Sequence, residues 1–239
     1  MSKRPGSGRS KGKSGARELF TKVRSAKGRK LSSTRWLQRQ LNDPYVAEAK
    51  RMGYPSRAAF KLVELDEKFK FLKPGKRVVD LGAAPGGWTM VAVEKVITNK
   101  KRGKVVALDI NEMDDVAGAT VLQHDFLDND APDLLKKALD GPADIVISDM
   151  AAPATGHTST DHIKIMALAE TALDFACEVL APDGIFIAKV LKGGTENELL
   201  AVMKQKFKTV RHAKPPASRS DSAEMYVVAT GYRGEGKED

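Results

Sequence analysis

The sequence predicts an α/β protein built on one open, doubly wound and mostly parallel β-sheet with helices on both faces. Short runs of β-branched and aliphatic residues alternate with helical stretches along most of the chain, which is the pattern of repeated β–α units. The predicted strands are continuously apolar, as expected for parallel strands that are covered on both faces. A glycine-rich turn follows the first strand, at the end of the sheet where such folds bind ligands.

Two helical regions are predicted before the first strand. Residues 31–51 have helical character and are interrupted by Pro44. A further helix is predicted over 56–69, with Ser56 as its N-cap, because a serine hydroxyl can accept a free N–H of the first turn. The apolar spacing of this helix indicates that its core-facing residues are Phe60, Val63 and Leu65.

The sheet region follows as a regular series of elements. We predict strands over 77–81, 104–109, 120–123, 143–148 and 185–191. We predict helices that start near residue 88, over 131–139, over 160–180 and after a capping box formed by Thr195 and Glu198. A polar turn separates the last two segments, 208–213 and 224–231, and this predicts a hairpin at the sheet edge with one antiparallel strand.

The composition restricts the class of protein. The chain has 239 residues, of which 41% are hydrophobic, and this is enough for one full-sized core. No apolar run reaches the ~18–20 residues that a membrane span needs, and no apolar stretch follows the N-terminal charges as in a secretory signal. The single cysteine, Cys177, excludes an intramolecular disulfide scaffold. We therefore expect a cytoplasmic protein without a membrane partner, and we take a monomer as the default.

The positive charge is concentrated at the N-terminus. The formal net charge is +9, but residues 1–40 hold 13 Lys or Arg and one acid, a net of +12, whereas residues 41–239 have a net of −3. The first part of this stretch is rich in Gly and Ser and almost free of apolar residues, so it cannot bury a core. We predict a flexible basic arm over 1–30 and a single domain over 31–239. A polyanion is the expected partner of the arm, and a solubility tail is the alternative.

The turn after the first strand has the sequence DLGAAPGG and contains Asp80, Gly82, Gly86 and Gly87. Glycines allow a ligand to approach the backbone closely, and the following helix presents free N–H groups. The turn lacks the G-x-G-x-x-G pattern of dinucleotide sites, and Pro85 removes one N–H donor. We therefore expect a ligand without phosphates at this turn, with Asp80 near its cationic group. A tight turn without a ligand is the alternative.

Acidic residues also follow the next two strands. Asp109 lies 29 residues after Asp80, in a position to accept both hydroxyls of a ribose, and Asp125 could accept the amino group of an adenine. Trp88 is adjacent to the glycine turn, where it either stacks near a cofactor or packs its helix. The four histidines show no metal-ligand spacing, so no metal site is predicted.

Charged residues interrupt or end three later strands. Asp149 follows the run DIVIS, Lys189 lies inside the run GIFIAKVL, and Glu224 begins the run EMYVVAT. If the last strand is antiparallel, these three side chains meet at one edge of the sheet. Burial favours the neutral form of a lysine, which makes Lys189 a candidate base. A structural ion pair is the alternative explanation.

Five stretches in collinear order, over about 31–232, carry a specific resemblance. They are GYPSRAAFKLVELDEKF, DLGAAPGGW, SDMAAP, IAKV and SRSDSAEMY. Together they resemble the FtsJ/RrmJ (RlmE) type ribose 2'-O-methyltransferases. The resemblance implies a Rossmann-like, S-adenosylmethionine-dependent methyltransferase fold, with a mostly parallel seven-stranded sheet that contains one antiparallel strand. It implies a catalytic tetrad of Lys61, Asp149, Lys189 and Glu224, and cofactor-binding positions at Gly86, Trp88, Asp109, Asp125 and Asp149.

The resemblance also implies a substrate. The bacterial members methylate a uridine ribose in the A loop of 23S rRNA, with the large ribosomal subunit as partner. Two features depart from the family pattern: the basic arm is longer than expected, and SDMAAP carries an inserted Ala. A tRNA or cap ribose methyltransferase and a non-catalytic ribosome assembly factor remain as alternatives, and a nicotinamide dehydrogenase is disfavoured by the glycine turn.

Overall fold

The computed structural model describes residues 21–23, 31–153, 155–192 and 196–234. The chain forms two compact units, Met1–Pro44 and Tyr45–Asp239. Residues 31–44 group with the first unit, and the division into an arm over 1–30 and a single domain over 31–239 stays a prediction. The predicted arm over 1–30 lies outside the described residues except for 21–23, and its flexibility stays a prediction.

In the first unit, Gln38 of helix α1 (Leu31–Leu41) and Asn42 just after it bind the segment 21–23 through side-chain hydrogen bonds. The amide oxygen of Asn42 accepts the N–H of Thr21 at 2.7 Å, and that of Gln38 accepts the N–H of Val23 at 3.1 Å. The predicted interruption at Pro44 is confirmed, because helix α2 (Pro44–Met52) begins there. Proline suits a first helical position, where no N–H is needed.

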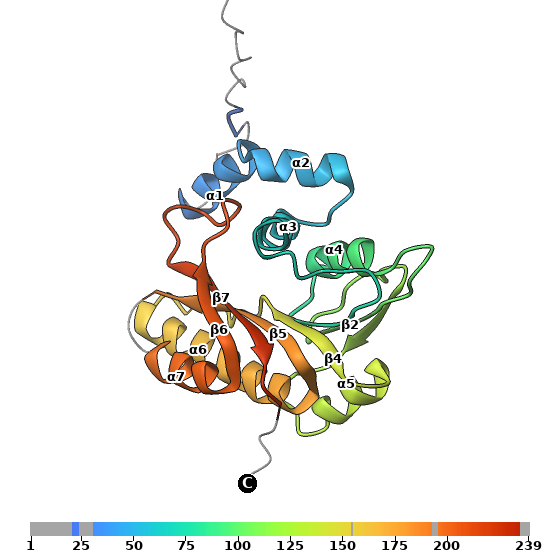
Figure 1. Ribbon diagram of the computed structural model, residues 1–239. Coiled ribbons are helices and arrows are strands. Elements are labelled where there is room, and N and C mark those ends of the chain that lie inside the picture. Colours follow the sequence, from blue (N-terminus) through green and yellow to red (C-terminus); the bar gives the residue numbers. More distant parts are fainter. Residues whose placement is uncertain (1–20, 24–30, 154, 193–195, 235–239) are drawn as a thin grey trace, which may run out of the picture. The chain divides into compact units, whose positions relative to one another are not determined.

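The second unit is built on one seven-stranded sheet of order β3-β2-β1-β4-β5-β7-β6 (Figure 1). The strands are β1 (Arg77–Leu81), β2 (Lys104–Asp109), β3 (Ala119–Gln123), β4 (Ala143–Ser148), β5 (Leu180–Leu191), β6 (Phe207–Ala213) and β7 (Glu224–Tyr232). Strand β7 is antiparallel to both of its neighbours, and the other described pairs are parallel. The predicted fold class is confirmed, although β5 begins five residues earlier than expected.

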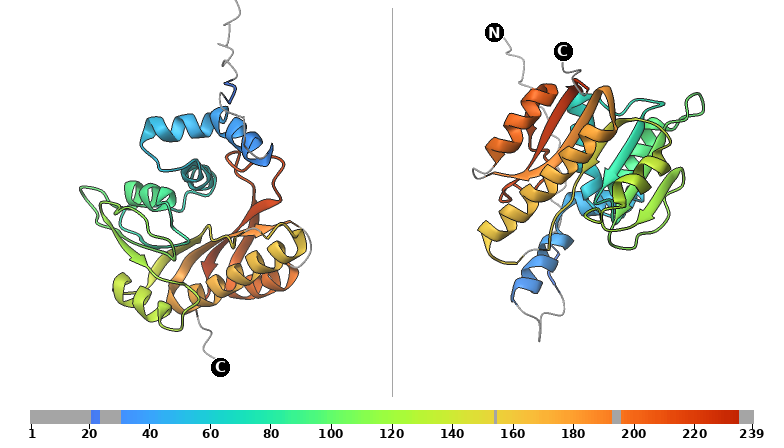
Figure 2. Two further views of the ribbon diagram at one scale, coloured as in Figure 1. Left: turned by 180° about the vertical axis from the view of Figure 1, so that it is seen from behind. Right: turned by 90° about the horizontal axis from the view of Figure 1, so that it is seen from below.

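Helices cover both faces of this sheet (Figures 1 and 2). Helices α3 (Ala58–Phe69) and α4 (Gly87–Val96) pack on one face, in an apolar cluster that also contains residues of β1, β4, β5 and β7. Helices α5 (Ala131–Leu139), α6 (Thr158–Val179) and α7 (Glu196–Lys206) pack on the other face. Among the described helices, none is both long enough and apolar enough to cross a membrane.

Helix α3 differs in detail from the prediction. Leu65 is buried as expected, but Leu62 is fully buried whereas Phe60 and Val63 are only partly buried. Ser56 accepts the N–H of Ala58 at 3.2 Å, but it lies one residue before the N-cap position. The face of α3 toward Phe60 and Val63 is therefore left at the edge of the core, near polar groups of the last hairpin. Thr195 of the predicted capping box lies outside the described residues.

The direction of β7 determines which side chains meet. Because β7 is antiparallel to β5, its first residue, Glu224, pairs with Leu191 at the carboxyl end of β5, and Tyr226 pairs with Lys189. Strand β4 ends beside β5 in the parallel part of the sheet, so Asp149 follows at the same edge. One edge of the sheet thus presents residues from three strands that are far apart in sequence.

Candidate active site

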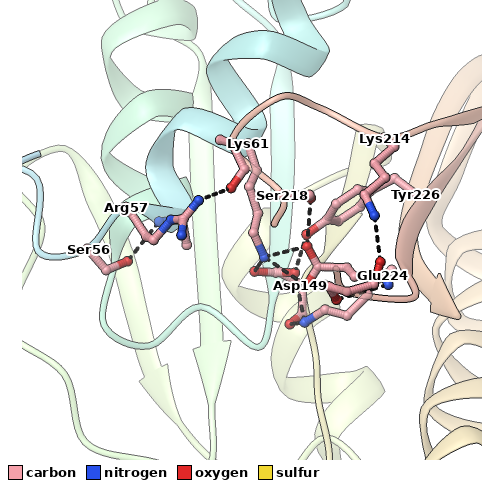
Figure 3. Close-up of polar contacts among 12 residues, drawn as sticks. Ser56, Arg57, Lys61, Asp149, Lys214, Ser218, Glu224 and Tyr226 are labelled. Atoms are coloured by element: carbon pink, nitrogen blue, oxygen red, sulfur yellow. Dashed lines mark hydrogen bonds and ion pairs between the residues drawn. The ribbon is translucent and has the colours of Figure 1, made fainter. Parts of the chain in front are cut away.

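The predicted tetrad is assembled at this edge from four elements (Figure 3). Lys61 comes from α3, Asp149 follows β4, Lys189 comes from β5 and Glu224 begins β7. Lys61 Nζ lies 2.8 Å from Glu224 Oε1 and 3.7 Å from Asp149 Oδ2. The four side chains therefore form one row, in the order Lys189, Asp149, Lys61 and Glu224, in which positive and negative groups alternate.

Lys189 is surrounded by oxygen atoms. Its side chain is 8% exposed, and its Nζ lies 2.8 Å from Asp149 Oδ1. The same Nζ donates to the main-chain oxygen of Asp149 at 2.6 Å and to that of Met150 at 3.5 Å. Three oxygen atoms therefore surround one nitrogen, and the role of Lys189 as a base stays a prediction.

Asp149 is held as a carboxylate by its neighbours. Burial opposes its charge most strongly, but the positive charges of Lys189 and Lys61 and the hydrogen bonds of Lys189 and Tyr226 outweigh burial and lower the pKa of Asp149 below its ordinary value. The Tyr226 hydroxyl donates to Asp149 Oδ1 at 2.6 Å. Burial, and then the negative charges of Asp149 and Glu224, raise the pKa of Tyr226 well above its ordinary range. Tyr226 therefore stays a hydroxyl donor.

Glu224 has both of its oxygens occupied. Lys61 Nζ donates to Oε2 at 2.9 Å, and the Ser218 hydroxyl donates to Oε1 at 2.7 Å. Sequence reasoning missed Ser218 and Tyr226, although both lie in the stretch SRSDSAEMY. Tyr226 could have been found from strand periodicity, since it lies two residues after Glu224 and shares a face with it.

A cavity of about 380 Å³ opens beside the tetrad, and Asp149 belongs to both. Four of the predicted cofactor residues line this cavity, namely Gly82, Asp109, Asp125 and Asp149. Its other walls are largely apolar and include Leu108, Ile110, Phe126, Leu127, Met150 and Leu168. A hollow with apolar walls and a few acceptors at strand ends is the usual form of a nucleoside site in such sheets.

The backbone at the cavity is tightly constrained. Gly82 has φ of +74°, and a Cβ added there would lie 2.6 Å from Cγ and 2.8 Å from Cα of Met150. Only glycine therefore lets the turn pass Met150 at this point. Asp109 is fixed as well, because its Oδ2 accepts the N–H of Ala84 at 2.9 Å and its Oδ1 accepts the N–H of Asn111 at 2.8 Å.

Four predicted cofactor residues, Asp80, Gly86, Gly87 and Trp88, are not among those that line the cavity. Gly86 is the left-handed N-cap of α4, with φ of +97°, and Gly87 is the first residue of that helix. The Trp88 indole N–H donates to the main-chain oxygen of Ala58 at 2.8 Å, and its ring packs 5.5 Å from that of Tyr226. The side chain of Trp88 thus joins α4 to α3 and to the sheet, and the packing alternative holds for it.

Asp80 is fully buried below the glycine turn. Its Oδ2 accepts the Thr89 hydroxyl at 2.7 Å, but its Oδ1 has no hydrogen-bond partner among the described residues. This unpartnered oxygen and the carboxylates of Asp109 and Asp125 are all hydrogen-bond acceptors, so acceptors predominate among the polar groups at and below the glycine turn. Such a set fits a ligand with hydroxyl, amino and cationic groups, as S-adenosylmethionine has, and it does not fit a phosphate.

The structure brings together one group that sequence spacing did not indicate. His124, Asp128 and Asp130 place one potential ligand atom each within 4.8 Å of one another. His124 Nε2 is hydrogen-bonded to Asp130 Oδ1 at 2.8 Å and lies 3.7 Å from Asp128 Oδ2, so contacts among the three side chains account for the arrangement.

The burial of Asp80 predicts a pH-dependent stability. Burial raises the pKa of Asp80 to about 7, more than the Thr89 hydrogen bond lowers it. Between about pH 4 and pH 7 the unfolded chain loses this proton and the folded chain keeps it, so rising pH destabilises the fold by about 1.4 kcal/mol per pH unit. Urea denaturation of the wild type and of Asp80→Asn across this window should show the variant gaining relative stability as pH rises. A difference that does not change with pH would contradict the assignment.

Comparison with known proteins gives closely similar sequences. The chain is 68% identical over 222 residues to the ribosomal RNA large subunit methyltransferase E of Paramagnetospirillum magneticum, covering 92% of this chain and 91% of that protein. It is 55% identical over 238 residues to the protein of the same name from Roseobacter denitrificans, covering 98% and 99% of the two chains.

A solved structure, assigned provisionally as a ribosomal RNA methyltransferase of Plasmodium falciparum, matches with a TM-score of 0.68 and 30% identity. The match covers 76% of this chain and all of that one. Residues 54–232, which include the glycine turn and the whole tetrad, match the FtsJ-like methyltransferase family. The chain therefore belongs to the family of FtsJ-like methyltransferases.

Proposed function

We propose that the protein methylates a ribose 2'-hydroxyl in the ribosomal RNA of the large subunit, in the cytoplasm. Our specific proposal is a uridine in the A loop of 23S rRNA, which makes the protein a 23S rRNA uridine-2'-O-methyltransferase. The observation that carries the proposal is the row Lys189–Asp149–Lys61–Glu224 beside a cavity of about 380 Å³, which Asp149 also lines. The names of relatives that match over nearly their whole length support the choice of RNA.

Membership of this family makes S-adenosylmethionine the methyl donor, and when bound it supplies a methyl group on a positively charged sulfur. Asp109 would accept the ribose hydroxyls of the cofactor, and Asp125 would accept from the adenine amino group. Ile110 and Leu127, which line the cavity and are 60% and 59% exposed, would cover the faces of the adenine. The cationic end would lie toward Asp149, whose negative charge it would stabilise, and its positive charge would favour ionisation of the buried Asp80.

In this proposal, the four tetrad residues position the acceptor ribose. The reaction is an in-line displacement, so most of the rate gain comes from holding the 2'-oxygen about 3–3.5 Å from the methyl carbon. Lys189, after releasing one proton to solvent, would accept the proton of the 2'-hydroxyl as the bond from the 2'-oxygen to the methyl carbon forms and the bond from that carbon to sulfur breaks. Asp149 would hold the lysine in both states. Lys61 and Glu224 orient the ribose.

The direct test uses methyl-labelled S-adenosylmethionine and large ribosomal subunits from a strain without this modification. After alkaline hydrolysis we expect label in resistant dinucleotides, because a 2'-O-methyl group removes the nucleophile that cleaves the neighbouring linkage. Label in mononucleotides would mean that a base is the acceptor. Label on free tRNA but not on subunits would point to a tRNA enzyme, and no label on any RNA would favour an assembly factor.

Substitution of Lys189 tests the catalytic assignment. Lys189→Met keeps the length of the side chain and removes the amine, and we expect kcat to fall by about 10²- to 10⁴-fold. Cofactor affinity should stay within about threefold, because Lys189 itself is not among the residues that line the cavity. Lys137→Met, at an exposed site on α5, is the matched control. A near wild-type rate for Lys189→Met would reject the assignment.

We also propose that the basic arm over 1–30 binds phosphates of the RNA. Residues 1–40 carry a net charge of +12, and lysines and arginines that neutralise phosphates release counterions. Deletion of 1–30 should weaken RNA binding and flatten its dependence on salt, measured as the slope of log Kd against log salt. An arm of scrambled sequence with the same charge should keep the slope, and an unchanged slope after deletion would show that the arm does not contact the RNA.

A further inference from the structure

One face of α3 contacts the last hairpin at two places. Arg57, Lys61 and Glu64 are spaced three to four residues apart and therefore share a face of the helix. Lys61 contacts Glu224 and Asp149 of the tetrad. Arg57 and Glu64 contact the loop over 214–223, which joins β6 to β7.

The second contact holds a single residue of that loop by its main chain. Glu64 Oε2 accepts the N–H of Ala217 at 2.7 Å, and Arg57 Nη2 donates to the main-chain oxygen of the same residue. Glu64 Oε1 accepts the Tyr45 hydroxyl at 2.7 Å, and the Arg57 guanidinium lies 5.4 Å from the centre of the Tyr45 ring. We call Tyr45, Arg57 and Glu64 the α3 clamp. It occupies both hydrogen-bonding groups of Ala217, which is 1% exposed.

The residue after the clamped one reaches the tetrad. Ser218 is 5% exposed, and its hydroxyl donates to Glu224 Oε1 at 2.7 Å (Figure 3). Ser218 follows Ala217 directly, so the clamped residue constrains its place in the loop, and its own N–H also donates to the main-chain oxygen of Pro215 at 2.8 Å. Two hydrogen bonds, joined by the peptide bond between Ala217 and Ser218, thus connect Glu64 to Glu224.

The rest of the loop is held in another way. Lys214 Nζ donates to the main-chain oxygens of Ser220 and Ser222, and this closes the part of the loop that leads into β7 (Figure 3). The clamp therefore adds a constraint specifically on residues 217 and 218. Attaching a loop through a half-buried carboxylate adds little stability, because the free energy of removing the carboxylate from water opposes the free energy of its hydrogen bonds. Such an attachment does fix the geometry of the loop.

We propose that Glu64 is a positioning residue of the methyl-transfer reaction, which acts through Ala217 and Ser218 to hold Glu224 in place. The proposal rests on the role of Glu224 given above. Glu64 contacts none of the tetrad side chains in the described structure, and its carboxylate is used by Tyr45 and Ala217. Its substitution should therefore change the rate of the chemical step and leave the cofactor cavity unchanged.

The first test compares three variants of α3 in the methylation assay. We expect Glu64→Ala to lower kcat by about 10- to 100-fold, because a small misplacement of a positioning group has an effect of this order. The affinity for S-adenosylmethionine should remain within about twofold of wild type, since Glu64 does not line the cavity. Glu64→Gln should recover most of the rate, because its amide oxygen can accept the Ala217 N–H. Glu67→Ala, exposed on the same helix, is the matched control and should behave as wild type.

The second test asks whether Glu64 acts through Ser218. Ser218→Ala removes the hydroxyl that reaches Glu224, and the double variant with Glu64→Ala should be no slower than the slower single variant. Effects that multiply would mean independent action and would overturn the connection through Ser218. A fall in cofactor affinity and in thermal stability that matches the fall in kcat would indicate a merely structural role and would also overturn it.

Hydrogen exchange tests the clamp without the reaction. Glu64→Ala should speed exchange in a peptide that covers 214–223, and Glu67→Ala should not. Unchanged exchange in Glu64→Ala would overturn the inference even if the wild type is active. If the wild type transfers no methyl group, the proposed function is wrong, and Glu64 then has no role in methyl transfer. Faster exchange in Glu64→Ala would in that case still show that the clamp holds the loop.

Discussion

Two lysines and two carboxylates meet at the carboxyl end of the sheet, and each buried charge depends on the next. Lys189 can be buried because Asp149 lies 2.8 Å away, and Asp149 stays ionised because Lys61 and Tyr226 also contact it. Removing one partner from such a set leaves an uncompensated charge, at a cost of about 3–5 kcal/mol. The positions of α3, β4, β5 and β7 are therefore coupled through one electrostatic arrangement. The site forms only when these elements pack together, and their packing is stable only when the charges of the site are paired.

The same arrangement explains why the cavity and the tetrad share Asp149. A cofactor with a positive sulfur and an RNA ribose must meet at one point, and a carboxylate between them can face both. Gly82 contributes to this arrangement. Its backbone lies close to Met150, so the glycine turn after β1 packs against the turn after β4. The geometry of the site is thus determined by backbone packing as much as by the charged side chains.

The sequence predicted the sheet, its antiparallel strand and the convergence of Asp149, Lys189 and Glu224, because hydrophobic periodicity and the carboxyl-end rule depend on local pattern. It did not predict the burial of Trp88 against Ala58 and Tyr226, since both outcomes fit a residue beside a glycine turn. It also missed Ser218 and Glu64. The contact of Glu64 with Ala217 joins segments about 150 residues apart, and no local pattern records such a contact. Ser218 lies only six residues before Glu224, but the conformation of the loop, rather than a strand or helix period, brings the two side chains together. The inward face of α3 was predicted only in part, because Leu65 is buried as expected but Leu62, rather than Phe60 or Val63, is the other large residue that is fully buried.

The position of β7 in the sheet has a consequence for synthesis of the chain. Strand β7 is the last in sequence, yet it lies between β5 and β6 rather than at the edge. A domain generally folds as one unit, and the seven strands belong to one sheet, so this sheet cannot be completed without β7. The gap beside β5 stays open until residues 224–232 are released from the exit tunnel. Glu224 and Tyr226 arrive with that strand, so the site closes only after residues 224–232 have left the ribosome.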